Sequence, residues 1–245
     1  MLSFVSNAKD NVPVLAEDSV RSSSHAKKFV DVKLQLTVGG SSSINNYAEA
    51  IPGLSDMQFS PGALFRTGID VAFNIRNYLA LGTGMEFGIN NTRCALNLID
   101  ANTSSINSAY FKNHFYELCV PVFLELRINL GRRIQCVVDL GTYVSYGLGG
   151  KVRASGYTSG QNSLGQPVIN HLFYKKDYYD GDISIINSVK RFDWGPRVSA
   201  GVLYKGHYSL NWVFQMSAPN IAINYNVMDV KYRHLSLGFE VGYVF

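Results

Sequence analysis

In several segments of this 245-residue sequence, charged side chains of both signs fall at positions of the same parity, all odd or all even, and they are its first candidates for chemistry. Glu117, Glu125 and Arg127 fall on one such segment, where their shared parity predicts one face of a strand. Carboxylates and guanidinium groups on a common face can pair with each other or line a path for a polar solute. We expect a packed polar network with these three residues near its centre. The predicted network consists of Arg66, Asp70, Glu86, Glu117, Glu125, Arg127, Asp139, Arg197 and Glu240.

The histidines indicate no catalytic or metal-binding site. No pair of them has the H-x-x-x-H spacing, and none joins a cysteine or an acid at metal-ligand spacing. His114 and His234 fall at expected strand ends, but no serine or acid partner for nucleophilic attack on a lipid can be named. We therefore predict no enzyme activity, no catalytic residue, no metal and no cofactor.

The glycines around Thr83 suggest a phosphate-binding loop at first sight. Gly82 and Gly84 flank this residue, and Gly88 lies four residues after Gly84. No predicted helix follows them, and a phosphate loop needs a helix amino terminus. We expect these glycines to serve packing instead.

Strands are the elements that must position these side chains. From Val30 to Val38 apolar even positions alternate with polar odd positions, which is the period-two pattern of a strand with two different faces. No run of about 18 apolar residues is present, so a transmembrane helix is excluded. The same alternation predicts further strands at residues 65–75, 79–89, 116–128, 134–146, 194–204, 208–216 and 235–245.

The connections between these segments alternate in length. Tight turns are predicted near Arg76–Asn77 and at residues 129–132 and 205–207. Long polar segments fall at residues 39–61, 90–113, 148–191 and 217–231. This layout predicts an all-β fold, a closed antiparallel up-and-down transmembrane β-barrel of about eight strands. Its short turns and both termini would be periplasmic, and its long loops extracellular.

The domain organisation follows from the same pattern. Residues 1–27 are polar and serine-rich without periodicity, and we expect a mobile tail there, followed by one barrel domain over residues 28–245. The start of the sequence has no apolar run long enough for a signal peptide. Because a membrane barrel must be exported, the sequence is expected either to be mature or to lack its true start.

Four features predict that the apolar faces of the strands meet lipid. The polar faces carry glycine, alanine and serine, which suit a narrow interior, together with charges that would cost about 2–4 kcal/mol each in mid-bilayer. The chain ends on a strand rather than on a helix. Outward aromatic residues cluster at the two ends of the strands, as expected for membrane interfaces. One predicted belt contains Phe65, Phe87, Tyr116, Tyr146, Trp194 and Phe214, and the other contains Phe73, Tyr204, Tyr208, Tyr243 and Phe245.

The composition is consistent with this interpretation and argues against nucleic-acid binding. Charged residues make up 16% of the chain and hydrophobic residues 47%, so the protein is poor in charge and rich in apolar side chains. The net charge of +4 is mild, and the basic residues do not form a stripe. We therefore expect no nucleic-acid partner.

Four short motifs resemble those of the PorT-like outer-membrane β-barrel proteins of Gram-negative bacteria. The strand FYELCVPVFL at residues 115–124 is similar to "YLEIPLLLK", and DLGTYVSY at residues 139–146 is similar to "GxGPYVxY". FDWG at residues 192–195, with SAG at residues 199–201, resembles "FDFGxxxGxG". The C-terminal GYVF, ending at Phe245, is similar to the aromatic-ended signal that the barrel-assembly machinery reads. Cys119, in place of an isoleucine, and Pro196 depart from the family pattern.

The resemblance covers about residues 29–245 and implies the outer membrane of a Gram-negative bacterium, but no uniform activity. The member that gives the family its name belongs to the type IX secretion and gliding apparatus. We therefore expect a non-enzymatic scaffold or accessory component, embedded in outer-membrane lipid and related to secretion or to the cell surface.

A partner site is predicted on the segment 148–191, where aromatic and charged residues could bind a protein or a glycan. The residues concerned are Tyr157, Phe173, Tyr174, Lys175, Lys176, Asp177, Tyr178, Tyr179, Asp180 and Asp182. Two alternatives to the scaffold stay open, a soluble lipocalin-like binder of an apolar ligand and a small solute pore. The alternative for this segment is a variable surface loop without a ligand.

Overall fold

The computed structural model describes residues 28–46, 54–100, 105–161, 165–179, 189–223 and 231–245. Nine strands run through these residues, and no helix among them is long and apolar enough to cross a membrane. The strands are β1 (Val30–Asn45), β2 (Leu54–Arg76), β3 (Leu79–Asp100), β4 (Ser105–Asn129), β5 (Ile134–Gln161), β6 (Pro167–Asp177), β7 (Phe192–Tyr204), β8 (Tyr208–Met216) and β9 (Tyr232–Val244).

Eight of these strands close into an antiparallel barrel. Consecutive strands pair with each other, except that β6 does not pair with β7, and β9 pairs with β1 to complete the ring. β5 crosses over to β7 within the ring, while β6 pairs with β5 alone. The predicted all-β closed antiparallel barrel of about eight strands is thus confirmed, with β6 as an added strand outside the ring.

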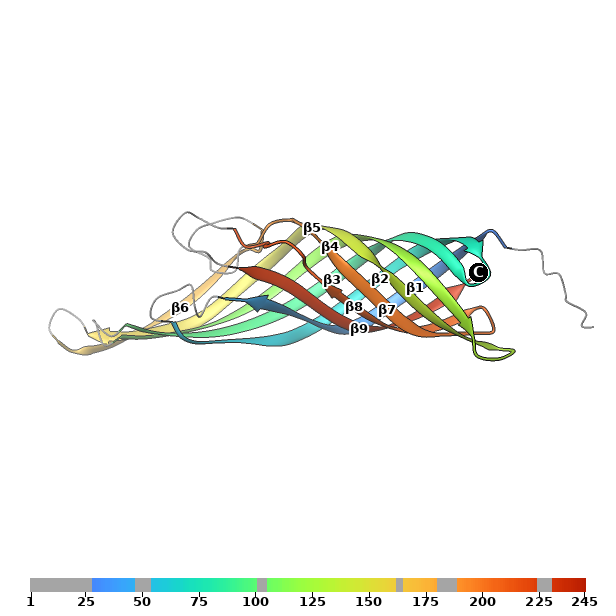
Figure 1. Cartoon of the computed structure of the whole chain (residues 1–245). Coiled ribbons are helices and arrows are strands. Elements are labelled where there is room, and N and C mark those ends of the chain that lie inside the picture. The colour runs from blue at the N-terminus through green and yellow to red at the C-terminus, as the bar shows by residue number, and fades with distance from the viewer. Residues whose placement is uncertain (1–27, 47–53, 101–104, 162–164, 180–188, 224–230) are drawn as a thin grey trace, which may run out of the picture.

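The two ends of the barrel differ in the length of their connections. At one end β2–β3, β4–β5 and β7–β8 are joined by short turns, and the carboxyl terminus lies at this end (Figure 1). In the three-residue β7–β8 connection Lys205 and Gly206 both adopt positive φ angles, of 52° and 74°, as the central residues of a type I′ turn require, and the His207 amide donates to the Tyr204 carbonyl at 3.1 Å. The three predicted tight turns are therefore confirmed. We call this the short-turn end and the opposite end the mouth.

The apolar face of each strand points outward around the barrel. Val120, Leu140 and Leu237 expose 37%, 48% and 40% of their surface. The acids on the other faces, Glu86, Glu125 and Asp139, are buried inside. A lipocalin-like barrel has the reverse arrangement, with an apolar interior, so the soluble alternative is wrong for these strands.

The segments predicted as long loops are largely strands. β3 and β4 pair in one constant register from Leu79–Leu126 to Asp100–Ser105. Residues 90–113 therefore form a strand hairpin, apart from residues 101–104, which lie outside the described residues. β5 likewise continues to Gln161 and pairs there with β6. Residues 39–45 and 54–61 prolong β1 and β2, whereas the described residues of 217–231 form no named strand. We call residues 90–100, 105–115 and 149–161 together with β6 the extension (Figure 1).

A β-bulge in β5 changes which side chains point inward where the extension begins. Glu117 of β4 pairs with Gly147, but Tyr116 pairs with Gly149, which leaves Leu148 without a partner on β4. Buried positions of β5 are odd-numbered before the bulge and even-numbered after it, as at Val152. One unpaired residue therefore directs the following basic side chains outward.

The mouth encloses an apolar core. Its buried residues come from the extension, from β9 and from the connections that follow β6 and β8, and Figure 1 shows these segments meeting at this end. We call this set the mouth core. It comprises Cys94, Leu96, Phe111, Phe115, Val152, Ala154, Tyr178, Val189, Ile221, Ala222 and Tyr232.

Candidate functional site

The middle of the barrel is filled by a buried ion-pair network around Arg197. Its guanidinium group donates to both carboxylate oxygens of Glu86, at 2.8 and 2.6 Å, in a bidentate arrangement. A carboxylate oxygen of Glu240 lies 3.5 Å from the same guanidinium, and the Gln35 amide donates to Glu86 at 2.6 Å. These side chains come from β7, β3, β9 and β1, so the network joins walls that are distant in sequence.

A second layer lies next to it around Lys33. The Lys33 ammonium lies 2.9 Å from Glu240 and 3.2 Å from Asp70, which links two carboxylates through one cation. The Asn211 amide donates to Glu240 at 3.0 Å. The Ser199 hydroxyl donates to Asp139 at 2.9 Å. Charges that are removed from water need such partners. The ion pairs and hydrogen bonds around Lys33 are therefore those expected of a filled interior.

A third layer closes the lumen toward the mouth. The Arg66 guanidinium donates to Glu117 from Nε and Nη2, at 3.1 and 2.8 Å. Its Nη1 donates to the Gln215 side chain at 2.8 Å. All three side chains are buried. This layer therefore seals the space between the Arg197 network and the mouth core.

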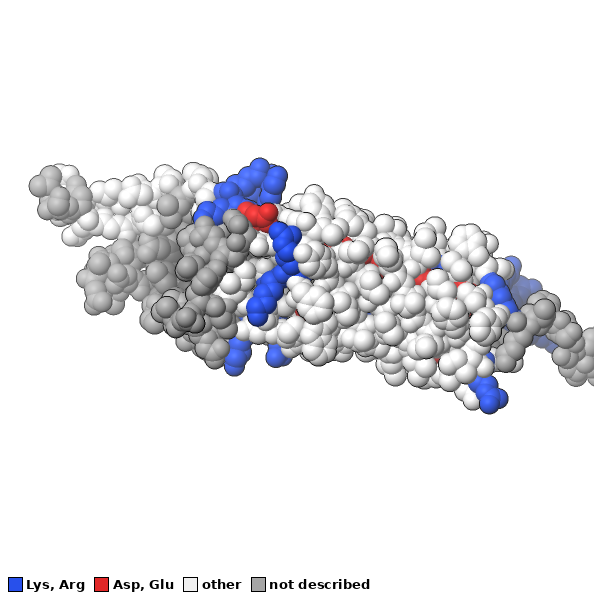
Figure 2. Space-filling model, turned by 90° about the horizontal axis from the view of Figure 1, so that it is seen from above, with Lys and Arg blue, Asp and Glu red and all other residues white. Residues whose placement is uncertain are grey.

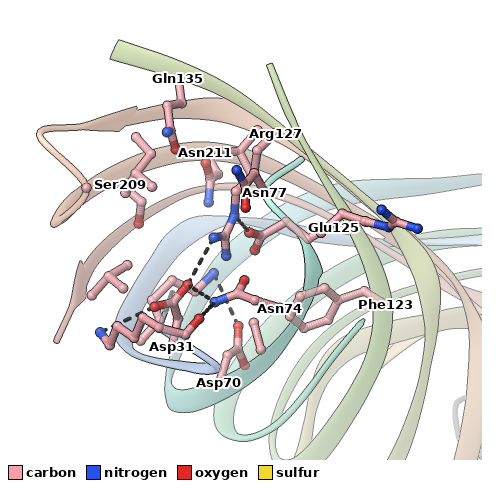
Figure 3. Close-up of a pocket in the computed structure, with 18 residues that line it drawn as sticks. Asp31, Asp70, Asn74, Asn77, Phe123, Glu125, Arg127, Gln135, Ser209 and Asn211 are labelled. Atoms are coloured by element: carbon pink, nitrogen blue, oxygen red, sulfur yellow. Dashed lines mark hydrogen bonds and ion pairs between the residues drawn. The ribbon is translucent and has the colours of Figure 1, made fainter. Parts of the chain in front are cut away.

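A fourth group lines a cavity of about 540 Å³ at the short-turn end. Arg127 donates to Asp31 at 3.0 Å and also pairs with its strand neighbour Glu125. The Asn74 amide donates to the same Asp31 carboxylate at 2.9 Å. Figure 3 shows these side chains converging from several strands, with Asp70 behind them. The cavity thus reaches Asp70 and Lys33 of the second layer.

Glycines make room for the network. A Cβ on Gly82 would meet the Phe123 ring at 2.3 Å, and one on Gly84 would meet the Asp70 carboxylate at 2.0 Å. At Gly88 the contacts would be Glu117 and Arg66. The side chains of the network thus occupy the space beside these residues, and packing accounts for this glycine series.

All nine predicted network residues face the lumen, but they do not share one centre. Glu117 belongs to the layer near the mouth, whereas Glu125 and Arg127 lie at the short-turn end. Eight residues separate Glu117 from Glu125 on β4, which is about 26 Å along a strand. The centre is instead Arg197 with Glu86 and Glu240.

The sequence interpretation missed the uncharged members of the network. Gln35, Ser199, Asn211 and Gln215 are buried and hydrogen-bonded to its charged groups. The sequence could have identified them, because they fall on the same inward-facing parity as the charged residues of their strands.

The mouth holds a further polar group beside its apolar core. Asp193 accepts hydrogen bonds from the Tyr143 hydroxyl at 2.9 Å and the Ser217 hydroxyl at 2.6 Å. The His234 ring stacks on Phe115, with centroids 5.0 Å apart, and its Nε2 lies 2.8 Å from the Tyr178 hydroxyl. Ser217 therefore bonds to an acid rather than to a histidine ring.

The aromatic residues predicted to bind a partner on segment 148–191 are divided by the fold. Tyr178 is fully buried in the mouth core, and Tyr179 packs against it, which raises the pKa of the Tyr179 hydroxyl through burial. Tyr157 and Phe173 remain exposed, at 43% and 78%. Asp180 and Asp182 lie outside the described residues. The predicted surface loop is thus largely a strand pair, β5 with β6, and the described residues that follow it, Tyr178 and Val189, lie in the mouth core.

All eleven aromatic residues assigned to the two belts point outward. Their exposed fractions range from 36% for Phe214 to 60% for Phe245. Phe87 stacks on Tyr116 toward the mouth, with centroids 6.2 Å apart, and Tyr243 contacts both Tyr208 and Phe245 at the short-turn end. On the face of the barrel that Figure 2 draws, a broad, largely uncharged band has lysine and arginine side chains at both borders.

Metal-ligating side chains are not gathered in the described part of the chain. Over those residues no three His, Cys, Asp or Glu side chains are arranged to hold a metal ion. The acids of the lumen are held instead by Arg, Lys and amide groups.

The closed ring, the outward apolar faces and the polar lumen together are typical of a bacterial outer-membrane barrel. A family model described as "Outer membrane protein beta-barrel domain" matches residues 22–243. The chain belongs to the outer membrane protein beta-barrel domain family.

Solved structures of other outer-membrane barrels resemble this family member in fold. OprG from Pseudomonas aeruginosa is 11% identical with a TM-score of 0.42, and the match covers 88% of this chain and 95% of that one. Ail from Yersinia pestis is 13% identical with a TM-score of 0.33, over 88% and 98% of the two chains. Neisserial surface protein A is also 13% identical, with a TM-score of 0.32, over 87% and 97%. No significant match is found among curated proteins.

This family places the protein in the outer membrane of a Gram-negative bacterium. In such barrels the short turns are periplasmic and the long connections extracellular. The short-turn end with its cavity is therefore periplasmic. The mouth and the extension are extracellular.

Proposed function

We propose that this outer membrane protein is a closed, non-enzymatic barrel that anchors an extracellular β-sheet to the membrane as a scaffold or accessory component. The observation that carries the proposal is the filled lumen. Between the Arg66 layer and the mouth core, the described residues surround a cavity of only about 10 Å³, which is room for about one water molecule. The periplasmic cavity thus ends blind against the network.

The network and the mouth core close the lumen independently. Opening the first requires separating Arg197 from Glu86 and Arg66 from Glu117, which leaves buried charges unpaired. Opening the second requires lifting Tyr178 and the other buried rings out of the mouth core. A solute path would need both changes at once.

The polar group of the mouth supports a non-enzymatic role. Nucleophilic catalysis needs a hydroxyl activated by a base, and the base held by a third group. Here the Ser217 hydroxyl donates to Asp193, while the His234 ring contacts Tyr178. The serine, histidine and acid are close together but are not connected in the order that activates a nucleophile.

Planar-bilayer recording tests the closed lumen. We expect the purified full chain to give no current steps, with an open porin recorded in the same bilayer as the positive control. Sustained steps from the wild-type chain would overturn the proposal. They would favour the small-pore alternative, which the periplasmic cavity supports.

Two narrower predictions belong to this proposal. The PorT-like relationship depends on motifs that lie in β4, β5, β7 and β9, and it associates the scaffold with secretion or the cell surface.

Recognition by the barrel-assembly machinery depends on the last strand, where Phe245 follows β9 with its ring 60% exposed. Deleting Phe245 is expected to lower the amount of folded barrel in outer membranes, measured by heat-modifiable gel migration. Unchanged amounts would contradict it.

A further inference from the structure

The outer face of the extension carries a row of four basic side chains. Arg93 of β3 lies opposite Lys112 of β4, Lys112 opposite Arg153 of β5, and Arg153 opposite Lys175 of β6. All four side chains are exposed. Neighbouring strands are about 4.8 Å apart, so the row spans roughly 15 Å across four strands. We call it the cation row.

No acid of the described residues neutralises this row. None of its four members forms an ion pair there. The nearest acid on this face by register is Asp177, which lies opposite Lys151, one row closer to the membrane. Like charges directly opposite each other destabilise a sheet. An anion bound along the row would remove this repulsion.

A groove of about 480 Å³ lies over three of the four members of the cation row. Lys112, Arg153 and Lys175 line it together with aromatic rings, and its lining contains no acid. The Lys112 ammonium lies 5.4 Å from the centroid of the Tyr110 ring, and the Phe173 ring is 78% exposed. Cations flanked by exposed rings suit a phosphorylated sugar, whose phosphates pair with the cations while its apolar ring face packs on the aromatics.

The height of the row above the membrane identifies the source of such a sugar. Tyr116, at the predicted interface, and Lys112 share the outward face of β4, four residues apart. Four residues of a strand tilted by about 40° rise roughly 10 Å along the membrane normal. That is headgroup level, above the acyl chains. The outer leaflet of this membrane consists of lipopolysaccharide, which carries phosphates on its innermost sugars.

We propose that the cation row binds the phosphates of lipopolysaccharide, with Tyr110 and Phe173 packing against its sugars. The proposal rests on the surface role given to the extension under the proposed function. It does not depend on whether the lumen conducts, so its failure would leave the conductance result unaffected. It assigns the outer face of the sheet to a lipid headgroup rather than to a soluble partner.

Equilibrium binding of Kdo2–lipid A to the full chain in detergent, followed by native mass spectrometry, tests this proposal. The test variant is Arg93→Gln/Lys112→Gln/Arg153→Gln/Lys175→Gln, for which we expect at least tenfold weaker binding. The control is Arg76→Gln/Arg132→Gln/Arg133→Gln/Lys205→Gln, which removes four exposed cations at the periplasmic end and is expected to bind within twofold of wild type. Heat-modifiable migration shows that each variant is folded, and the single variant Arg153→Gln is expected to bind a few-fold more weakly.

Two further probes identify the source of the anion. Wild type is expected to bind dephosphorylated Kdo2–lipid A at least tenfold more weakly than the phosphorylated lipid. Equal binding of the two lipids would overturn the proposal, because the acyl chains would then carry the affinity. The proposal would also be overturned if the fourfold variant of the cation row bound phosphorylated Kdo2–lipid A as tightly as wild type does. Tighter binding of soluble heparin than of the lipid would assign the row to a soluble polyanion instead.

Discussion

The membrane part and the extracellular part of this barrel share the same strands but place opposite kinds of side chain inside. On β4 the interior holds Glu117 and Glu125 in the membrane part, with Val120 and Leu124 outside. Farther along the same strand the interior holds Phe111 and Phe115 of the mouth core, with Lys112 outside. The backbone pairing is continuous between the two. The surrounding solvent, rather than the fold, therefore decides which face is polar.

The energetic reason differs between the two parts. Around the extracellular part lies water, and burying apolar surface there stabilises the fold by about 25 cal/mol per Å². Around the membrane part lie acyl chains as apolar as leucine, so moving leucine inside gains little. There the interior can be stabilised by paired charges and hydrogen bonds, which no lipid could satisfy.

The largest effect is expected from breaking the central pair of the membrane part. Glu86→Ala leaves the buried Arg197 without its bidentate partner, and removing one member of such a pair costs about 3–5 kcal/mol in free energy of unfolding. Urea unfolding in detergent, followed by heat-modifiable gel migration, measures it. The double variant Glu86→Met/Arg197→Met is the control and should recover much of the loss. A single variant as stable as wild type would show that the network does not hold the barrel together.

The next effect tests which face meets lipid. Leu140→Arg puts a cation on the outward face of the membrane part and is expected to cost about 2–4 kcal/mol in free energy of folding. Tyr157→Arg makes the same residue on the outward face of the extension and should stay within about 0.5 kcal/mol of wild type. Folding titrations into phospholipid vesicles compare the two. If the two variants lost equal amounts of folding free energy, the outward faces of the two parts would not be in different solvents, and the comparison would be wrong.

The smallest effect concerns the mouth core. Ile221→Val removes one buried methylene and is expected to cost about 0.5–1.5 kcal/mol, felt locally. Proteolysis of the extracellular part should then speed up about two- to tenfold, while the heat-modifiable shift of the barrel stays unchanged. Ile169→Val, on the exposed surface of β6, is the matched control and should have no effect. A barrel that melts earlier would mean that the two parts unfold together.

The sequence predicted the membrane part well because its signal is local. Lipid on one side and a polar lumen on the other force strict alternation, and each of the eight predicted segments lies within or next to a barrel strand. The strands of the extension were not predicted because polar and small residues occupy much of it, so its outer face has no strict alternation of apolar residues. In β5 the bulge at Leu148 also interrupts the parity on which the prediction relied.

Most charged members of the candidate site were predictable from the sequence, but their pairing was not. Inward parity selects Glu86 and Arg197 separately, yet they are 111 residues apart and meet only because the ring closes with one particular stagger. For Tyr178 even membership of the core was not predictable from the sequence. Its position after a polar strand suggested a surface residue, and only the return of the chain into the mouth makes it part of the core.

β5 runs for 28 residues without a break, pairing first with β7 and then with β6. Its other edge stays paired with β4 throughout, through the bulge. The sheet that projects from the cell is thus a stiff continuation of the barrel wall and lacks a flexible stalk. A pull on its tip would tilt the whole barrel in the bilayer, so mechanical load at the surface would reach the surrounding lipid directly.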